Sequence, residues 1–169
     1  KRCLVGSEMC IRDSPISEFI PVARISDMLL QPGKVFSYNG NEIKYPDIKL
    51  VYWAGGNPFH HQMNLKKLVK AFKQPDTIIV NEIWWNSLAR HSDIILPATT
   101  SLERNDISIK HWDQTISPMY KAIEPIGESK SDYEIFSEIS SKLNFKDKFT
   151  EGKDEDKGLK FIWEEAKNK

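Results

Sequence analysis

Two apolar runs on either side of a helix-like stretch constrain the fold of this chain more than any other feature. Residues 48–54 are apolar nearly throughout and end at paired glycines, as expected of a strand that is buried on both faces of a sheet. Residues 65–72 carry apolar side chains at helical spacing after Asn64, a candidate N-cap, and residues 77–80 form the second apolar run. Strand, crossover helix and strand predict a right-handed βαβ unit with parallel strands.

Further short elements surround this unit. Residues 20–30 have the pattern of a short helix, and Asn39-Gly40 between two alternating runs predicts a β-hairpin. Residues 85–91 are long enough for another short helix, and residues 93–97 supply a third strand that ends at a proline. Each of the three predicted strands is therefore followed by a loop.

The second half of the chain adds helices. Ser131 begins a Ser-x-x-Glu capping box, and a last amphipathic helix follows a charged loop at 150–156. The predicted fold is α/β: a Rossmann-like, mostly parallel sheet with flanking helices, plus a small β-hairpin near the start. We expect residues 1–14 to be an artefactual or unstructured leader and residues 15–169 to form one α/β domain, a length sufficient for a real core.

Charge and composition exclude several partners. The chain has 24 basic and 24 acidic residues, so no net field favours nucleic acid or an anionic membrane surface. Its apolar stretches are far shorter than the roughly 20 residues that span a bilayer. Cys3 and Cys10 are the only cysteines, which is neither a disulfide framework nor a zinc signature.

The loops after the first two strands are candidate binding sites, because ligands of open parallel sheets bind beyond the carboxyl ends of the strands. The first loop offers close backbone approach at Gly56 and an amide at Asn57, as a phosphate or sugar requires; a tight strand-to-helix turn is the alternative. The second begins with Asn81 and Glu82, whose carboxylate could accept ribose hydroxyls or the donor edge of guanine. A solvated loop acid is the alternative reading there.

The third loop, residues 97–106, contains Arg104. Its planar guanidinium could bind a pyrophosphate through two parallel hydrogen bonds. The alternative is an ion pair with Glu103 or Asp106 on the surface.

The histidines do not form a metal-binding pattern. His60 and His61 are adjacent, His91 and His111 stand apart, and no His-x-x-x-His or Cys-x-x-Cys spacing occurs. This disfavours a small metallohydrolase built on the first three histidines and Glu82, and we expect no metal site in this chain. Gly-x-Ser-x-Gly, Walker and Gly-x-Gly-x-x-Gly motifs are also absent, so hydrolase, kinase and classical dehydrogenase functions lack support.

Four segments, taken together and in order, carry a more specific pattern: residues 20–30, 51–59, 89–106 and 131–136. They resemble the third domain of the dimethyl sulfoxide, trimethylamine N-oxide and biotin sulfoxide reductase family of molybdoenzymes. The resemblance extends over nearly everything after residue 15. Glu-Arg-Asn-Asp within the third segment, together with Asn-Pro-Phe-His-His from residue 57, narrows it to the S-oxide and N-oxide reductases.

The resemblance implies a domain that binds one guanine dinucleotide of a Mo-bis(molybdopterin guanine dinucleotide) cofactor. In that family, residues matching Asn57, His61, Asn81, Glu82 and Arg104 approach the dinucleotide. With two further residues of the strand-end loops, the predicted cofactor-binding set is Gly56, Asn57, His61, Asn81, Glu82, Ala98 and Arg104. The family's molybdenum ligand is a serine that no segment here matches, so we predict no catalytic residue.

The implied enzyme is a molybdopterin-dependent reductase of S-oxides or N-oxides that works by oxygen-atom transfer in anaerobic respiration. This chain would be a fragment that is inactive alone. Its partners would be the remaining domains, a small oxide substrate and an electron-donor cytochrome, and the resemblance favours the periplasm over the cytoplasm although the chain carries no signal.

The alternative function is a stand-alone nucleotide-binding regulatory module without redox activity. Such a module should have a sealed surface, whereas a domain cut from a larger enzyme should expose an apolar patch. Five tryptophans favour the cut domain, although we expect most of them to lie in the core: Trp53, Trp84, Trp85 and Trp112.

Overall fold

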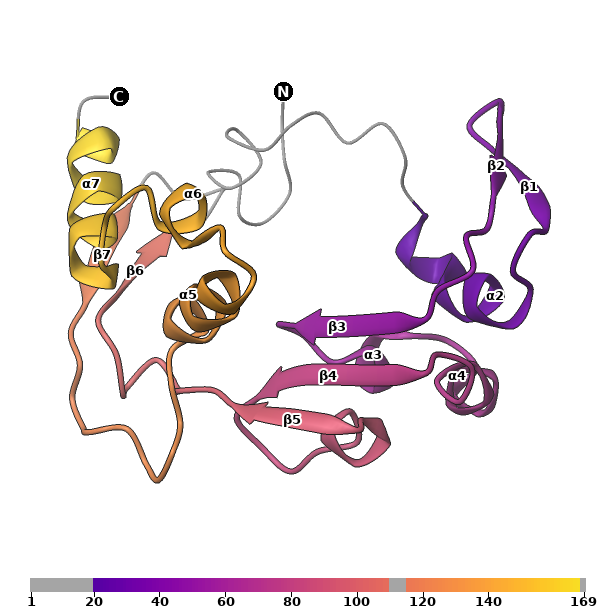
Figure 1. Cartoon of the computed structure of the whole chain (residues 1–169), viewed down its shortest axis with the longest axis horizontal. Helices are drawn as coiled ribbons and strands as arrows, with labels where there is room; N and C mark the ends of the chain where they lie inside the picture. The colour runs from indigo at the N-terminus through magenta and orange to yellow at the C-terminus, as the bar shows by residue number, and fades with distance from the viewer. Residues whose placement is uncertain (1–19, 110–114, 168–169) are drawn as a thin grey trace. The chain divides into compact units, whose positions relative to one another are not determined.

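The computed structural model describes residues 20–109 and 115–167 (Figure 1). The expected leader, Trp112 and His111 lie outside the described residues. Contacts divide the described residues into two compact units, one ending at Leu96 and one beginning at Pro97, and each is described by itself. The expectation of one domain over residues 15–169 stays a prediction.

The first unit contains the predicted parallel sheet. Strands β3 (Leu50–Ala54), β4 (Thr77–Glu82) and β5 (Ile94–Pro97) lie in the order β3-β4-β5, and their arrows point the same way in Figure 1. Between β3 and β4 the chain forms α3 (Pro58–His61) and α4 (Leu65–Ala71). Strands β3 and β4 pair in parallel, so the predicted βαβ unit is confirmed.

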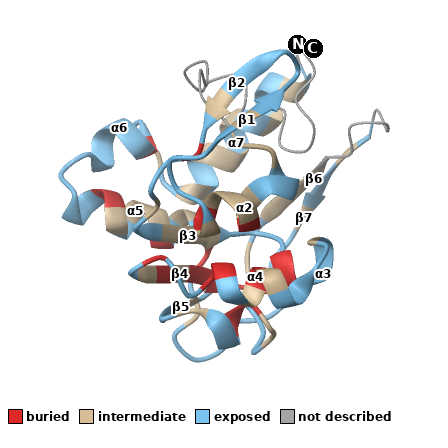
Figure 2. Cartoon of the chain, turned by 90° about the vertical axis from the view of Figure 1, so that its right-hand side faces the viewer, coloured by how far each residue is buried: buried red, intermediate tan, exposed pale blue. Residues whose placement is uncertain are grey.

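Burial differs between the strands of this sheet. The central strand β4 is the most buried, and its Ile78 and Val80 belong to the core (Figure 2). Strand β3 is exposed at both ends and only partly buried between them, so the prediction that both its faces are buried is wrong. The physical reason is position: in the described part of the chain β3 has a hydrogen-bonded neighbour on one side only.

One apolar cluster forms the core of this unit. Its members come from α2 (Ile25–Leu30), α3, the inner face and C-cap of α4, β4 and the turn before Ala89: Leu29, Phe59, Leu68, Ala71, Phe72, Ile78, Val80 and Leu88. The helical spacing of apolar residues in α4 explains why Leu68 and Ala71 face inward while its lysines stay at the surface. The Asn64 side chain caps α4 by accepting the Lys67 N–H at 3.2 Å, as predicted.

The predicted N-terminal elements are present. A 3₁₀ turn (Val22–Arg24) leads into α2 (Ile25–Leu30), where Asp27 pairs with Arg24 and Lys67. Strands β1 (Val35–Tyr38) and β2 (Asn41–Lys44) form the predicted hairpin.

The turn of this hairpin explains its sequence signal. Asn39 and Gly40 have φ of 50° and 78°, and two successive positive φ values are what a two-residue hairpin turn needs. Asparagine and glycine are the residues that adopt them most readily.

The helix predicted at residues 85–91 is mostly wrong. Only Ala89–His91 is helical, as one 3₁₀ turn. The Asn86 side chain accepts the N–H groups of Leu88 and Ala89 at 2.9 and 3.1 Å, which stabilises a turn where a longer helix would otherwise begin.

The second unit has an antiparallel pair, β6 (Asp106–Ile109) and β7 (Ile116–Met119), which the sequence did not predict. Helices α5 (Asp132–Lys142), α6 (Lys146–Thr150) and α7 (Glu155–Lys167) follow. The expected charged loop is thus limited to the residues between α6 and α7. No helix in the described ranges is long and apolar enough to cross a membrane.

The predicted capping box begins α5. Ser131 Oγ accepts the Glu134 N–H at 3.1 Å, and the Glu134 carboxylate accepts the Ser131 N–H at 2.9 Å. Both partners of the box are therefore satisfied, as the Ser-x-x-Glu pattern predicted.

Candidate functional site

The turn after β3 is shaped by two glycines. Gly55 and Gly56 have φ of 79° and 69°, a conformation that costs other residues energy, and a Cβ added at either would meet nothing within 4 Å. Trp53 Nε1 donates to the Gly55 carbonyl at 2.9 Å and fixes the start of the turn. The result is open space beside backbone at the carboxyl end of a strand.

Asn57 follows this turn and is only 9% exposed. Its Oδ1 accepts the Phe59 N–H at 2.9 Å and so begins α3, which means that the strand-to-helix turn offered as the alternative is present. Its Nδ2 is buried and has no hydrogen-bond partner among the described residues. A buried donor left unpaired costs roughly 1–3 kcal/mol, so this amide is suited to an acceptor supplied from outside the chain.

Histidines of this region differ in their surroundings. His60 and His61 are exposed on α3. His91 is exposed as well, but its ring stacks on Phe59 with centroids 4.4 Å apart and its Nδ1 lies 2.7 Å from the Ser87 carbonyl oxygen.

Asn81 and Glu82 are the last two residues of β4, whereas the sequence placed them at the start of a loop. Pairing with β3 continues to Ala54, which lies opposite Asn81, and this extends the strand. Asn81 is buried, and its Oδ1 accepts the Tyr52 hydroxyl at 2.7 Å. The Glu82 carboxylate accepts the N–H of Ile83 at 3.0 Å.

Tyr52 was missed by the sequence reasoning. It lies opposite Ile79 in the parallel register, and Asn81 is two residues further along β4, so Tyr52 and Asn81 share a face of the sheet. The period of two along each strand could have indicated this contact once the register was known.

The residues that follow β4 are apolar and exposed. Trp84 and Trp85 are 68% and 67% exposed, and Ile83 is 43% exposed. The prediction that most tryptophans lie in the core is wrong for these two, while Trp53 is partly buried and packs 6.2 Å from Phe72 between ring centroids. A stand-alone regulatory module would require a sealed surface, whereas this loop exposes three apolar side chains.

The third loop lies in the second unit. Ala98 forms a parallel bridge with Lys130, and Thr99 N–H donates to the Lys130 carbonyl at 3.0 Å. Thr99 is 4% exposed, and its Oγ1, like Asn57 Nδ2, is buried with no hydrogen-bond partner in the part of the chain that the structure describes. The sequence reasoning did not single out Thr99, because nothing in Ala-Thr-Thr distinguishes the buried threonine from its neighbour.

Glu103 fixes the shape of this loop. Its buried carboxylate accepts the N–H of Thr100 at 2.7 Å and of Ile126 at 2.8 Å. These hydrogen bonds, that of Thr100 first, hold the pKa of Glu103 below its ordinary value.

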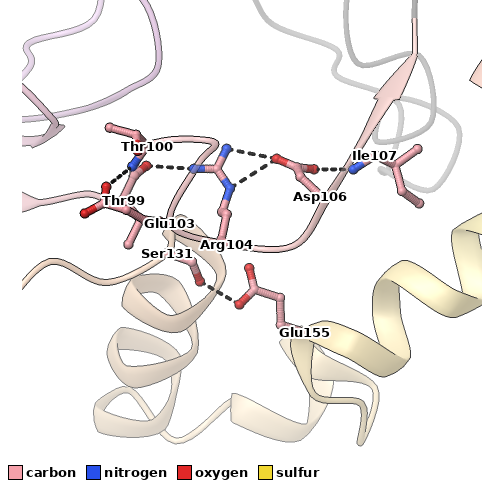
Figure 3. Close-up of polar contacts among 8 residues, drawn as sticks. All are labelled: Thr99, Thr100, Glu103, Arg104, Asp106, Ile107, Ser131 and Glu155. Carbon is pink, nitrogen blue, oxygen red and sulfur yellow. Dashed lines mark hydrogen bonds and ion pairs between the residues drawn. The ribbon is translucent and has the colours of Figure 1, made fainter. Parts of the chain in front are cut away.

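Arg104 is engaged within the same loop (Figure 3). Its Nε and Nη2 donate to one Asp106 oxygen at 3.1 and 2.9 Å, and its Nη1 donates to the Thr99 carbonyl at 2.7 Å. The ion pair with Asp106, one of the alternatives that the sequence offered, is therefore present. Three of the five N–H groups of the guanidinium are used by these bonds.

The acidic, histidine and cysteine side chains that the structure describes do not cluster as metal ligands do. Among the described residues, no group of three or more His, Cys, Asp or Glu side chains is arranged to hold a metal ion.

Comparison with known proteins identifies the family. A family model described as molybdopterin oxidoreductase matches residues 11–142. The chain belongs to this family. The resemblance described from the sequence is confirmed.

Relatives of this molybdopterin oxidoreductase chain are reductases by name. It is 49% identical to biotin sulfoxide reductase of Cereibacter sphaeroides over 91% of the chain and 47% identical to trimethylamine-N-oxide reductase of Haemophilus influenzae over 95%. It is 48% identical to dimethyl sulfoxide/trimethylamine N-oxide reductase of Rhodobacter capsulatus over 87%. The chain spans 21%, 20% and 18% of these three proteins, about a fifth of their length.

A solved structure supports the fold. Acetylene hydratase from Pelobacter acetylenicus superimposes with a TM-score of 0.54 at 19% identity, over 60% of this chain and 14% of that one. The predicted α/β class, with a parallel sheet, flanking helices and a hairpin, is confirmed.

Family membership implies a molybdenum–molybdopterin cofactor for the whole protein. Four of the predicted residues, Gly56, Asn57, Asn81 and Glu82, lie at or just beyond the carboxyl ends of two neighbouring strands in the first unit. Ala98 and Arg104 belong to the second unit. The unpaired Asn57 amide fits a ligand with hydrogen-bond acceptors, as phosphates and sugars are.

Proposed function

We propose that this chain is the part of a molybdenum-dependent S-oxide or N-oxide reductase that holds one guanine dinucleotide of a Mo-bis(molybdopterin guanine dinucleotide) cofactor. The observation that carries the proposal is the buried, unpaired Nδ2 of Asn57 at the carboxyl edge of a parallel sheet. The names of relatives that are 47–49% identical support the substrate class. No specific observation favours the stand-alone regulatory module.

The first loop would contact the phosphate or sugar part of the dinucleotide. Asn57 Nδ2 would donate to an oxygen of the ligand while its Oδ1 keeps capping α3. Gly56 would allow the ligand to approach the backbone, because no side chain fills the space beside it. His61, exposed on α3, would add a polar contact from the same segment.

The end of β4 would bind the nucleoside. The Glu82 carboxylate is an acceptor suited to ribose hydroxyls or to the donor edge of guanine. Asn81 is oriented by its hydrogen bond with Tyr52, which leaves the asparagine amide group in one fixed direction. Such strand-end binding is what a Rossmann-like domain provides.

Ala98 and Arg104 would act from the second unit. Arg104, within that unit, would bind an anionic oxygen, either through the N–H groups that Asp106 and Thr99 do not occupy or by exchanging Asp106 for a phosphate. Asp106 would then hold the guanidinium in place before the cofactor arrives.

The cofactor, when bound, supplies the oxygen-atom transfer that reduces the oxide. This chain positions the cofactor and compensates its charge; the residue that binds molybdenum, the remaining domains and the substrate funnel belong to the rest of the enzyme. We also propose a small S-oxide or N-oxide as substrate, a cytochrome as electron donor in anaerobic respiration, and a periplasmic location.

Titration of the purified chain with GDP tests the role of Asn57. Asn57→Ser keeps an oxygen that can cap α3 but removes the buried donor, so affinity should fall roughly 2- to 12-fold, the equivalent of one hydrogen bond. Asn64→Gly is the matched control, because it removes the cap of α4 at a residue that already has a φ of 56°. Equal GDP affinity of the Asn57→Ser and unmodified chains, both shown to be folded by circular dichroism, would refute this role.

A further inference from the structure

The loop after β4 presents an unusual apolar surface, which we name the tryptophan loop: Ile83, Trp84 and Trp85. All three residues are more than 40% exposed, and they follow one another directly. An aromatic side chain buries about 150–250 Å² in a core, so two indoles exposed by two thirds leave roughly 200–350 Å² of mostly apolar surface in water. An exposed apolar area of this order is comparable to the largest apolar patch on a typical monomer, and such patches are often functional.

The tryptophan loop is held in shape by residues other than its tryptophans. The Ile83 N–H bonds the Glu82 carboxylate at its start, and the Asn86 N–H bonds the Trp84 carbonyl at 2.8 Å at its end. Leu88 and Ala89, which follow, are buried in the core and tied to Asn86. Backbone and Asn86 hydrogen bonds therefore define the conformation of the loop while both indoles stay about two thirds exposed.

We propose that the tryptophan loop is a docking surface for the polypeptide of the same enzyme that lies outside this chain. The inference rests on the proposed function in one respect, that the chain is part of a larger reductase. The chain spans 18–21% of its relatives, so about four fifths of a relative's length is available to cover the surface.

The chemistry of the loop favours polypeptide over cofactor. A nucleobase stacks on one ring face and would leave the second indole and Ile83 in water. An apolar side-chain surface of a neighbouring domain can cover all three residues, and aromatic residues are enriched at the centres of such interfaces.

Hydroxyl-radical footprinting with mass spectrometry tests the proposal, because it reports each tryptophan separately. The samples are the 169-residue chain, the full-length enzyme with cofactor, and the full-length enzyme purified from cells that cannot make molybdopterin. A reporter peptide added to every sample corrects for radical dose. The oxidation rates of Trp84 and Trp85 are the quantities compared.

Both full-length forms should show oxidation of Trp84 and Trp85 reduced roughly fivefold or more, since residues at the core of an interface lose most of their exposed surface. Equal rates in the chain and the full-length enzyme would overturn the proposal. Protection only in the cofactor-loaded enzyme would also overturn it, because the cofactor would then be the occupant. Protection in both forms without any GDP binding by the chain would keep the docking surface and reject the proposed cofactor role.

Discussion

Ser131 links the start of α5 to α7, so its replacement by alanine gives a prediction with a calculable size. Ser131 is buried, caps α5 through the Glu134 N–H, and donates from Oγ to the Glu155 carboxylate at 2.9 Å (Figure 3). Loss of a serine N-cap costs about 0.5–2 kcal/mol. Loss of a hydrogen bond to a charged group costs about 1.5–3 kcal/mol when buried, and less here because Glu155 is only partly buried and water can replace the serine.

Ser131→Ala should therefore lower the free energy of unfolding by about 1–3 kcal/mol, less than the sum of both effects because they share one oxygen. Urea unfolding of the purified chain, followed by circular dichroism, measures the change. Ser141→Ala is the matched control: Ser141 is exposed on the same helix, and surface substitutions change stability by less than about 0.5 kcal/mol. If Ser131→Ala were as stable as Ser141→Ala, the capping box would not stabilise this unit as argued.

Three further predictions follow from single features. Burial raises the pKa of Glu155, so the folded state binds this proton more tightly than the unfolded state does. The free energy of unfolding should therefore fall as pH rises from the ordinary glutamate pKa through the raised value. Glu155→Gln should abolish that part of the pH dependence in urea unfolding, and an unchanged pH profile would contradict the prediction. Gly55→Ala should lower the free energy of unfolding by roughly 1 kcal/mol or more, because φ at Gly55 is 79°. Gly158→Ala, in α7 with an ordinary φ, should be neutral or stabilising in the same assay. Equal effects of the two substitutions would argue against the left-handed turn. Replacing Trp84 and Trp85 together by serine should raise the concentration at which the chain aggregates, measured by light scattering, without lowering its melting temperature; a lower melting temperature would mean that the indoles pack within the chain.

Local signals made much of the fold predictable. The capping box at Ser131, the cap at Asn64 and the hairpin turn at Asn39-Gly40 each depend on neighbours within a few residues, and all three are confirmed. The βαβ unit was predictable because apolar periodicity and length distinguish its strands from its helix.

Features that depend on distant partners were not predictable. Strand β4 continues through Asn81 because β3 offers pairing up to Ala54, and no property of Asn81-Glu82 alone indicates this. The pair β6 and β7 likewise arises from contacts between two separate segments. Trp84 and Trp85 were expected in the core because tryptophan is usually buried, a tendency that does not hold for these two exposed side chains.

Prediction of the site was limited in the same way. The strand-end rule located Gly56 and Asn57, but only the structure distinguishes the capping Oδ1 of Asn57 from its unpaired Nδ2. The sequence left open whether Arg104 pairs with Glu103 or Asp106 or stays free for a phosphate, and only the structure shows its two hydrogen bonds to Asp106.

A preference for guanine over adenine nucleotides tests whether this chain holds a guanine dinucleotide. We would titrate the unmodified chain, shown to be folded, with GMP, GDP and ADP in a calorimeter. Both guanine nucleotides should bind more tightly than ADP, and GDP should be the tighter of the two because its second phosphate would add contacts with the proposed phosphate-binding loop. Equal binding of GDP and ADP, or no binding of any of the three, would contradict the claim that this chain holds the guanine dinucleotide.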